Sequence, residues 1–255
     1  MDRSRRKAGR EVARTQDALP DQVAELVGEV AEAPAPSRRR MLTGEISRIA
    51  GRSGRAGWRG TLSAGRWLTA EVLAMAPRIP VRDQQRLRAQ HPGLGPEELA
   101  DALIQGAGRA ASVVGAAAGA AMVLPLPSAP VEVAVETLAL VGIEIKLVAE
   151  LHEVYGMRAP GSSHERMMAY VAAWAHRRGV ALAPAGLVVM AGSPLRRRLQ
   201  RRLLARAGRS AMSLGPLLTG AVAGAALNRS ETRHLGAEVR DDLRRRSPNA
   251  AGWTH

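Results

Sequence analysis

Small side chains dominate the apolar part of this chain, and they limit its fold more than any other feature. Alanine supplies 47 of the 255 residues and glycine 26, while phenylalanine is absent and only two tyrosines occur. Alanine buries little surface, so a core that contains so much of it must be closely packed. Helices pack closely through small side chains, whereas sheets favour β-branched and aromatic residues. The composition therefore predicts an all-α fold, an Ala/Gly-rich helical bundle with a disordered basic N-terminal arm.

The pattern of apolar residues divides the chain into three parts. Residues 1–77 form a basic, largely flexible region, with short helices expected at 20–31 and 61–76 and a stop at Pro77. From residue 78 the periodicity becomes regular, which predicts a folded helical domain at 78–245. Residues 246–255 are expected to be a flexible tail. The absence of cysteine excludes disulfides, Cys-liganded zinc, iron–sulfur clusters and thiol catalysis.

Within the domain, three helices have clear signals. Gly95-Pro96-Glu97-Glu98 places proline in a first helical turn and two carboxylates at the positive end of the helix. The stretch 131–155 is apolar over most of its circumference, so we expect a deeply buried helix that ends at Gly156. Ser162 and Glu165 have the spacing of a capping box and predict a further helix start.

Positive charge is concentrated at the two ends of the chain. The net charge is +14, and the three segments 1–90, 91–175 and 176–255 carry +8, −5 and +11. Only two of the basic residues are lysines, so part of the arginine excess reflects the codon usage of a GC-rich genome. A charge of this size favours a polyanionic partner or surface.

Three uncharged spans, of 22, 17 and 19 residues, cover 110–131, 179–195 and 210–228. About 20 residues are needed to cross a bilayer core, but small residues dominate these spans and contribute little to insertion. Two of the spans contain Gly-xxx-Gly pairs, which put two glycines on one helix face and let another backbone approach. We expect helix contacts at these four positions, in a membrane or in a soluble bundle: Gly115, Gly119, Gly220 and Gly224.

An arginine-rich stretch, 196–209, separates the last two spans. Leucines recur there every four residues, which predicts a basic helix with one apolar edge. Its expected anionic-lipid surface consists of Arg196, Arg197, Arg198, Arg201 and Arg202. Guanidinium groups also bind nucleic-acid phosphates, but no aromatic residue occurs between 175 and 252. Single-strand binders interleave such rings with their cations, so the sequence does not favour nucleic acid, although duplex binding through phosphates stays open.

Catalytic candidates are few. His164-Glu165 begins like a zincin motif, but Met168 stands where the second histidine belongs, so we expect no metal and no cofactor. Glu144 interrupts an apolar helix face. A buried carboxylate must be paired, hydrogen-bonded or protonated, so Glu144 is either half of an internal ion pair, with Arg109 or Arg166, or the acid of a hydrolase.

The order of these elements resembles the EcsC protein family. The resemblance covers about residues 78–245 and rests on Gly95-Pro-Glu-Glu-Leu, the helix with Gly115 and Gly119, the helix that closes on Tyr155-Gly156, the run from Leu214 to Asn228, and Thr232-Arg-His-Leu-Gly236. It implies a helical, membrane-linked protein without an established molecular activity, from a family named for its association with an ABC-type transport system. The chain differs in its basic N-terminal arm and in lacking phenylalanine.

These observations favour a non-enzymatic, membrane-associated accessory or scaffold protein. Its expected partners are an anionic membrane surface or the bilayer, on the cytoplasmic side, and a transport-system or other membrane protein. Integral and peripheral attachment both stay open, as does oligomerisation. The alternatives are a phosphate-backbone nucleic-acid binder and a hydrolase centred on Glu144.

Overall fold

A computed structural model describes residues 19–32, 61–121, 129–183, 186–189 and 215–247 of the chain. The all-α fold is confirmed for these residues, with one small addition, a two-stranded hairpin. The elements in chain order are α2 (Leu19–Glu32), α4 (Thr61–Met75), the 3-10 turn η1 (Ala76–Arg78), α5 (Gln84–Gln90), α6 (Pro96–Ala121), α7 (Ala129–Val154), α8 (Ser163–Arg178), β1 (Val180–Ala183), β2 (Gly186–Val189) and α10 (Gly215–Arg246).

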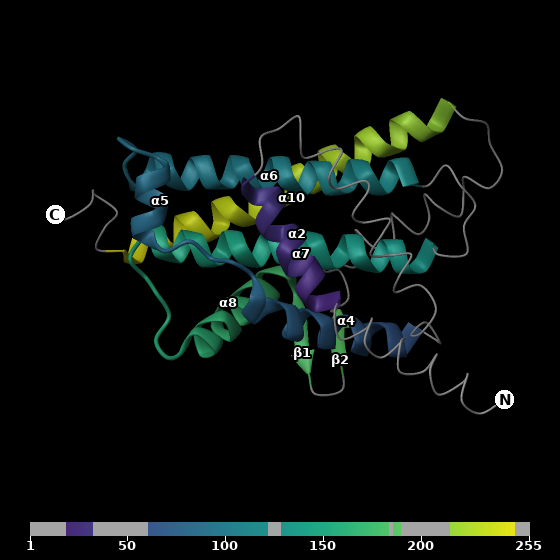
Figure 1. The fold of residues 1–255 in the computed structure, drawn as a ribbon, viewed down its shortest axis with the longest axis horizontal. Coiled ribbons are helices and arrows are strands. Elements are labelled where there is room, and N and C mark those ends of the chain that lie inside the picture. Colours follow the sequence, from purple (N-terminus) through teal and green to yellow (C-terminus); the bar gives the residue numbers. More distant parts are fainter. Residues whose placement is uncertain (1–18, 33–60, 122–128, 184–185, 190–214, 248–255) are drawn as a thin grey trace.

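Helix α7 lies at the centre of the bundle and confirms the buried helix expected at 131–155. Every residue from 135 to 151 is buried. Helix α6 runs beside α7, the C-terminal half of α10 packs on it, α2 crosses it, and α8 packs against it on the side of the hairpin (Figure 1). Even its polar residues are buried, including Glu136, Glu144, Lys146 and Glu150. Each of these charges therefore needs a partner from a neighbouring element.

The two N-terminal helices belong to this same core. Helix α2 buries an apolar stripe that includes Val23, Leu26 and Val27, and α4 buries Val72 and Met75. These side chains form one cluster with those of α6, α7, α8 and α10. Gly142 of α7 makes the contact close, because a Cβ there would lie 2.6 Å from Val27 Cγ2. The core therefore extends across the boundary expected at residue 78.

Helices α6 and α10 are antiparallel and share the most extensive contact between helices. Asp101 of α6 meets Arg240 of α10 at 2.5 Å, and Ala111 of α6 accepts a hydrogen bond from Asn228 of α10 at 3.4 Å. Gly236 allows the approach between these points, because a Cβ there would lie 2.8 Å from Ile104 Cγ1. Small residues on both helices thus let the two backbones pack closely.

Local capping signals set two helix ends where the sequence predicts them. The backbone N–H of Gly95 donates to Glu98 Oε2 at 2.7 Å, and Pro96 begins α6. Ser162 and Glu165 form a complete capping box at the start of α8. At the other end of α8, Gly179 has a left-handed backbone with φ of 62°, which suits glycine.

The hairpin corrects the expectation that residues 179–195 form one uncharged, span-length segment. Val180 pairs with Val189 and Ala183 with Gly186 in antiparallel register. The β-branched residues at 180, 188 and 189 favour strands, and Gly179 ends the preceding helix. Among the helices described, none combines the length and hydropathy that crossing a membrane requires.

Candidate functional site

A cavity of about 300 Å³ opens between α6 and α7 and is bordered by the end of α5. Its α6 wall is made mostly of small residues, among them Ala102, Gly106 and Ala110, and α7 contributes Ile143 and Leu147. A Cβ placed on Gly106 would meet no atom within 4 Å. The hollow therefore follows directly from the small residues on this face of α6.

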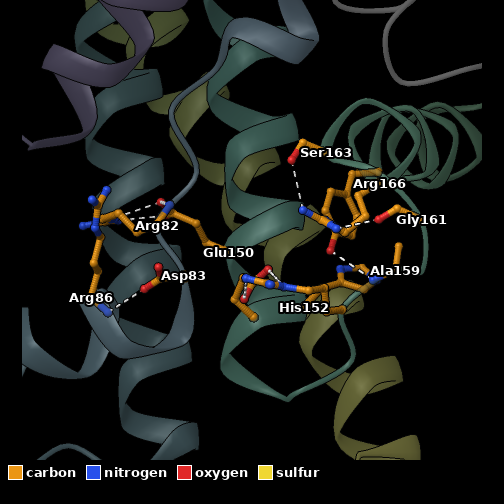
Figure 2. A network of polar contacts seen from close by, with 12 residues as sticks. Arg82, Asp83, Arg86, Glu150, His152, Ala159, Gly161, Ser163 and Arg166 are labelled. Atoms are coloured by element: carbon orange, nitrogen blue, oxygen red, sulfur yellow. Dashed lines mark hydrogen bonds and ion pairs between the residues drawn. The ribbon is translucent and has the colours of Figure 1, made fainter.

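Arg82, Lys146 and Glu150 form a charged group on one side of the cavity. Arg82 lies just before α5 and reaches across to α7, where its Nε and Nη2 donate to the two oxygens of Glu150 at 2.8 and 2.7 Å (Figure 2). Lys146 Nζ lies 2.9 Å from Glu150 Oε1, one turn away on α7. It also donates to the carbonyl oxygen of Pro80. This group joins the chain before α5 to the central helix.

Glu150 is held in its ionised form. Burial alone would raise the pKa of its carboxyl, but the hydrogen bonds from Arg82 and the positive charge of Lys146 outweigh burial and keep this pKa below its ordinary value. The group therefore contains two cations and one anion at neutral pH. Its lysine is almost fully buried, with 3% of the side chain exposed, so the extra positive charge is poorly hydrated.

Arg109 adds a further cation at the rim of the cavity. It projects from α6, is exposed, and has no hydrogen bond or ion pair with any residue in the described ranges. Gln90 and His91 lie at the end of α5 on the same border. The sequence did not predict this site. Its one local signal is the pair Lys146 and Glu150, four residues apart on a mostly apolar helix.

Glu144 does not line the cavity between α6 and α7. Its oxygens accept from Arg178 Nη2 at 2.5 Å and Nε at 3.0 Å, from Trp174 Nε1 at 2.9 Å and from Thr232 Oγ1 at 3.1 Å, and the residue is 1% exposed. The expected partners were wrong: Arg109 lies at the cavity rim, and Arg166 donates to the carbonyl oxygen of Gly161. The true partner, Arg178, lies one turn beyond Trp174 on α8. Buried side chains of α8 and α10 occupy both oxygens of Glu144, so its carboxylate is not accessible to a substrate.

Two of the four predicted glycines face each other where α6 meets α10. A Cβ on Gly115 would lie 3.1 Å from the carbonyl oxygen of Gly224 and 2.6 Å from Asn228 Nδ2. Gly119 and Gly220 belong to the same two helices, but their surroundings lie outside what the structure describes. The five arginines from Arg196 to Arg202 also lie outside the described residues.

A row of four arginines follows the α6 side of α10. Arg240 and Arg244 meet carboxylates of α6, at Asp101 and Glu97. Arg229 and Arg233 lie over Gly108, since a Cβ there would be 2.8 Å from Arg233 Cγ and 3.5 Å from Arg229 Cγ. Both are exposed, and neither makes a hydrogen bond or ion pair within the described part of the chain.

No group of histidine and carboxylate side chains in the described ranges is arranged to hold a metal ion. The chain matches no family model, no curated protein and no solved structure.

Proposed function

We propose that the protein is a non-enzymatic, membrane-associated accessory or scaffold protein that binds anionic lipid surfaces on the cytoplasmic side. The observation that carries the proposal is the separation of charge along the chain. The residues that the structure describes hold 17 basic and 19 acidic side chains, so this helical part is nearly neutral. The remaining segments hold 20 basic and only four acidic side chains.

Blocks of like charge typically serve as interaction segments. Here the blocks lie at 1–18, 33–60 and 190–214, and the last of them contains Arg196–Arg202 and leads directly into α10. Each arginine near an anionic membrane surface contributes about 1 kcal/mol of attraction. Several arginines acting together are enough for peripheral binding, so the proposal needs no membrane-spanning helix.

The described surface of α10 supports the same function. The spacing of Val222, Arg229 and Arg233 puts these three side chains on one helix face. Val222 is 68% exposed, the most of any large apolar side chain in the described residues, and both arginines are exposed. An apolar side chain beside cations is typical of helices that lie on a membrane surface. The resemblance to the membrane-linked EcsC family agrees with this proposal.

Duplex nucleic acid is the second candidate, because phosphates attract the same guanidinium groups. Residues 176–252 contain no aromatic side chain on which nucleic-acid bases could stack. The exposed Val222 can insert among lipid acyl chains, whereas a nucleic-acid backbone offers it no apolar contact. We therefore favour the membrane.

Vesicle flotation tests the proposal. The full chain should float with vesicles of phosphatidylcholine and phosphatidylglycerol, and should stay at the bottom with phosphatidylcholine alone. Raising the salt from about 50 mM to about 500 mM should release it, since charge attraction between exposed groups is screened. Recovery only in the soluble fraction at every lipid composition would overturn the proposal. So would retention on duplex DNA at salt concentrations that release the vesicles.

Two sets of substitutions locate the surface. Replacing Arg196, Arg197, Arg198, Arg201 and Arg202 with Gln should abolish flotation at intermediate salt. The double variant Arg229→Gln with Arg233→Gln should weaken binding to the vesicles by about thirtyfold, since each charge contributes about 1 kcal/mol. The matched control is Arg86→Gln with Arg88→Gln on α5, which removes the same charge from another exposed place. If this control weakens flotation equally, α10 is not the binding face.

A further inference from the structure

The residues that line the cavity between α6 and α7 carry more positive than negative charge. Three cations line the cavity, Arg82, Arg109 and Lys146, and Glu150 is the one carboxylate among its lining residues. Glu150 already accepts from both Arg82 and Lys146. A buried positive charge without a matching anion is costly. An anion in the cavity would remove that cost.

Two donors are placed to hold such an anion. The Lys146 ammonium has three N–H bonds, of which one is directed to Pro80 and one to Glu150. Arg109 has the whole guanidinium available, since it makes no contact of this kind with the described residues. The two side chains border the same cavity from neighbouring helices, so an anion bound there is attracted to both.

The part of the wall where α6 faces α7 is apolar. Leu103, Ala107 and Ala110 on α6 face Ile143 and Leu147 on α7. Ligand sites commonly combine such a wall with a few polar groups that fix orientation, and their volumes begin near 300 Å³. The space is thus sized for a compact molecule rather than for a nucleotide or a long acyl chain.

We propose that this cavity binds a small organic anion, with its carboxylate or phosphate between Arg109 and Lys146 and its apolar body against Leu103, Ile143 and Leu147. Glu150 and Arg82 hold Lys146 in place and do not contact the apolar body. The site is distinct from the proposed membrane surface, because its donors come from α6 and α7 and not from α10 or the segment 190–214.

Isothermal titration of the full chain, without lipid, tests the ligand class with three probes of similar size. Hexanoate and phenyl phosphate present the two anionic groups, and hexanamide is the neutral match of hexanoate. At least one of the two anions should bind saturably. The neutral hexanamide should bind at least tenfold more weakly than the better of the two anions. Inorganic phosphate should bind more weakly than phenyl phosphate, because it lacks the apolar body.

Two substitutions place the binding in the cavity. Arg109→Gln removes an exposed side chain without a partner in the described structure, so the fold should persist, and affinity for the anion should fall by about tenfold, the usual effect of losing one charged hydrogen bond. Gly106→Leu should abolish binding by filling the cavity, since a Cβ there meets open space. Ala172→Leu on the exposed face of α8 is the control and should bind like the wild type.

Three results would overturn this inference. They are the failure of both anions to bind, binding of hexanamide as tight as that of the better anion, and unchanged affinity in both Arg109→Gln and Gly106→Leu. If inorganic phosphate binds as tightly as phenyl phosphate, the apolar part of the ligand contributes nothing to binding, and the cavity is a site for an inorganic ion only. Because no vesicle is present, these outcomes are independent of the flotation experiments.

Discussion

Arg178 and Glu144 form a buried ion pair that joins α8 to α7, with Nη2 of the arginine 2.5 Å from Oε1 of the glutamate. Thr232 adds a donor from α10, so one carboxylate connects three helices. The arginine also donates to the carbonyl oxygen of Glu231 at 3.2 Å, which orients it from the α10 side. These contacts fix how the three helices meet at this point.

Removing one partner of this pair should destabilise the fold strongly. Glu144→Ala removes the buried carboxylate and leaves Arg178 with the partly exposed carboxylate of Glu231, 3.5 Å from its Nη1. Losing one partner of a buried pair costs about 3–5 kcal/mol of unfolding free energy. Urea unfolding followed by circular dichroism measures this loss. The double variant Glu144→Leu with Arg178→Met should recover most of the stability, because two apolar side chains replace both charges. A single variant as stable as the wild type would show that the pair does not hold the helices.

Adding one methyl group at Gly115 should separate α6 from α10. The new Cβ of Gly115→Ala would lie 2.6 Å from Asn228 Nδ2 and 3.1 Å from the carbonyl oxygen of Gly224. Overpacking of this kind costs about 1–3 kcal/mol. The control is Gly106→Ala on the same helix, where the Cβ meets nothing and the better helix propensity should add up to about 1 kcal/mol. Thermal unfolding of the two variants should therefore shift in opposite directions.

Acid should weaken the contact between Arg82 and Glu150. The lowered pKa of Glu150 means that the unfolded chain takes up a proton at a higher pH than the folded chain. The stability that this carboxylate provides is therefore complete above its ordinary pKa of 4.5 and is lost as the pH falls from there through the lowered pKa. Glu150→Gln should flatten the stability profile in that window, measured by urea unfolding at a series of pH values. Arg86→Gln, a cation outside the network, should retain the slope.

His152 should produce a second acid-sensitive step at higher pH. Burial lowers the pKa of its ring below 6.5, although the hydrogen bond with the Val148 carbonyl opposes this. The unfolded chain therefore binds a proton first as the pH falls below 6.5, and the folded state loses stability there. His152→Gln and His152→Phe should both flatten this step, although only Phe preserves a ring beside Tyr170. A step that persists in both variants would assign the titration to another group.

The helix ends and the buried central helix could be predicted from the sequence because their causes are local. The capping box at Ser162, the proline at the start of α6 and the continuous apolar pattern of α7 each act within a few residues. The same local logic identified Gly115 and Gly224 as small positions, although not which helices they would join.

The partner of Glu144 and the cavity depend on contacts between segments far apart in the chain. Arg178 is 34 residues from Glu144, and Arg82 is 68 residues from Glu150. No periodicity within one helix reveals which cation reaches which carboxylate. The short hairpin was missed for a related reason: an uncharged run of small and branched residues suits a buried helix or a strand equally well.

The polar side chains of α7 also restrict how this helix can sit among its neighbours. Glu144 meets Arg178 from α8, Glu150 meets Arg82 from the chain before α5, and Glu153 meets Arg158 from the turn that follows. A slip by one residue along the axis would turn all three carboxylates away from their guanidinium groups at once. A helix that is apolar around most of its circumference would tolerate several such alignments, so the buried charges select one of them and give the central helix a unique depth in the bundle.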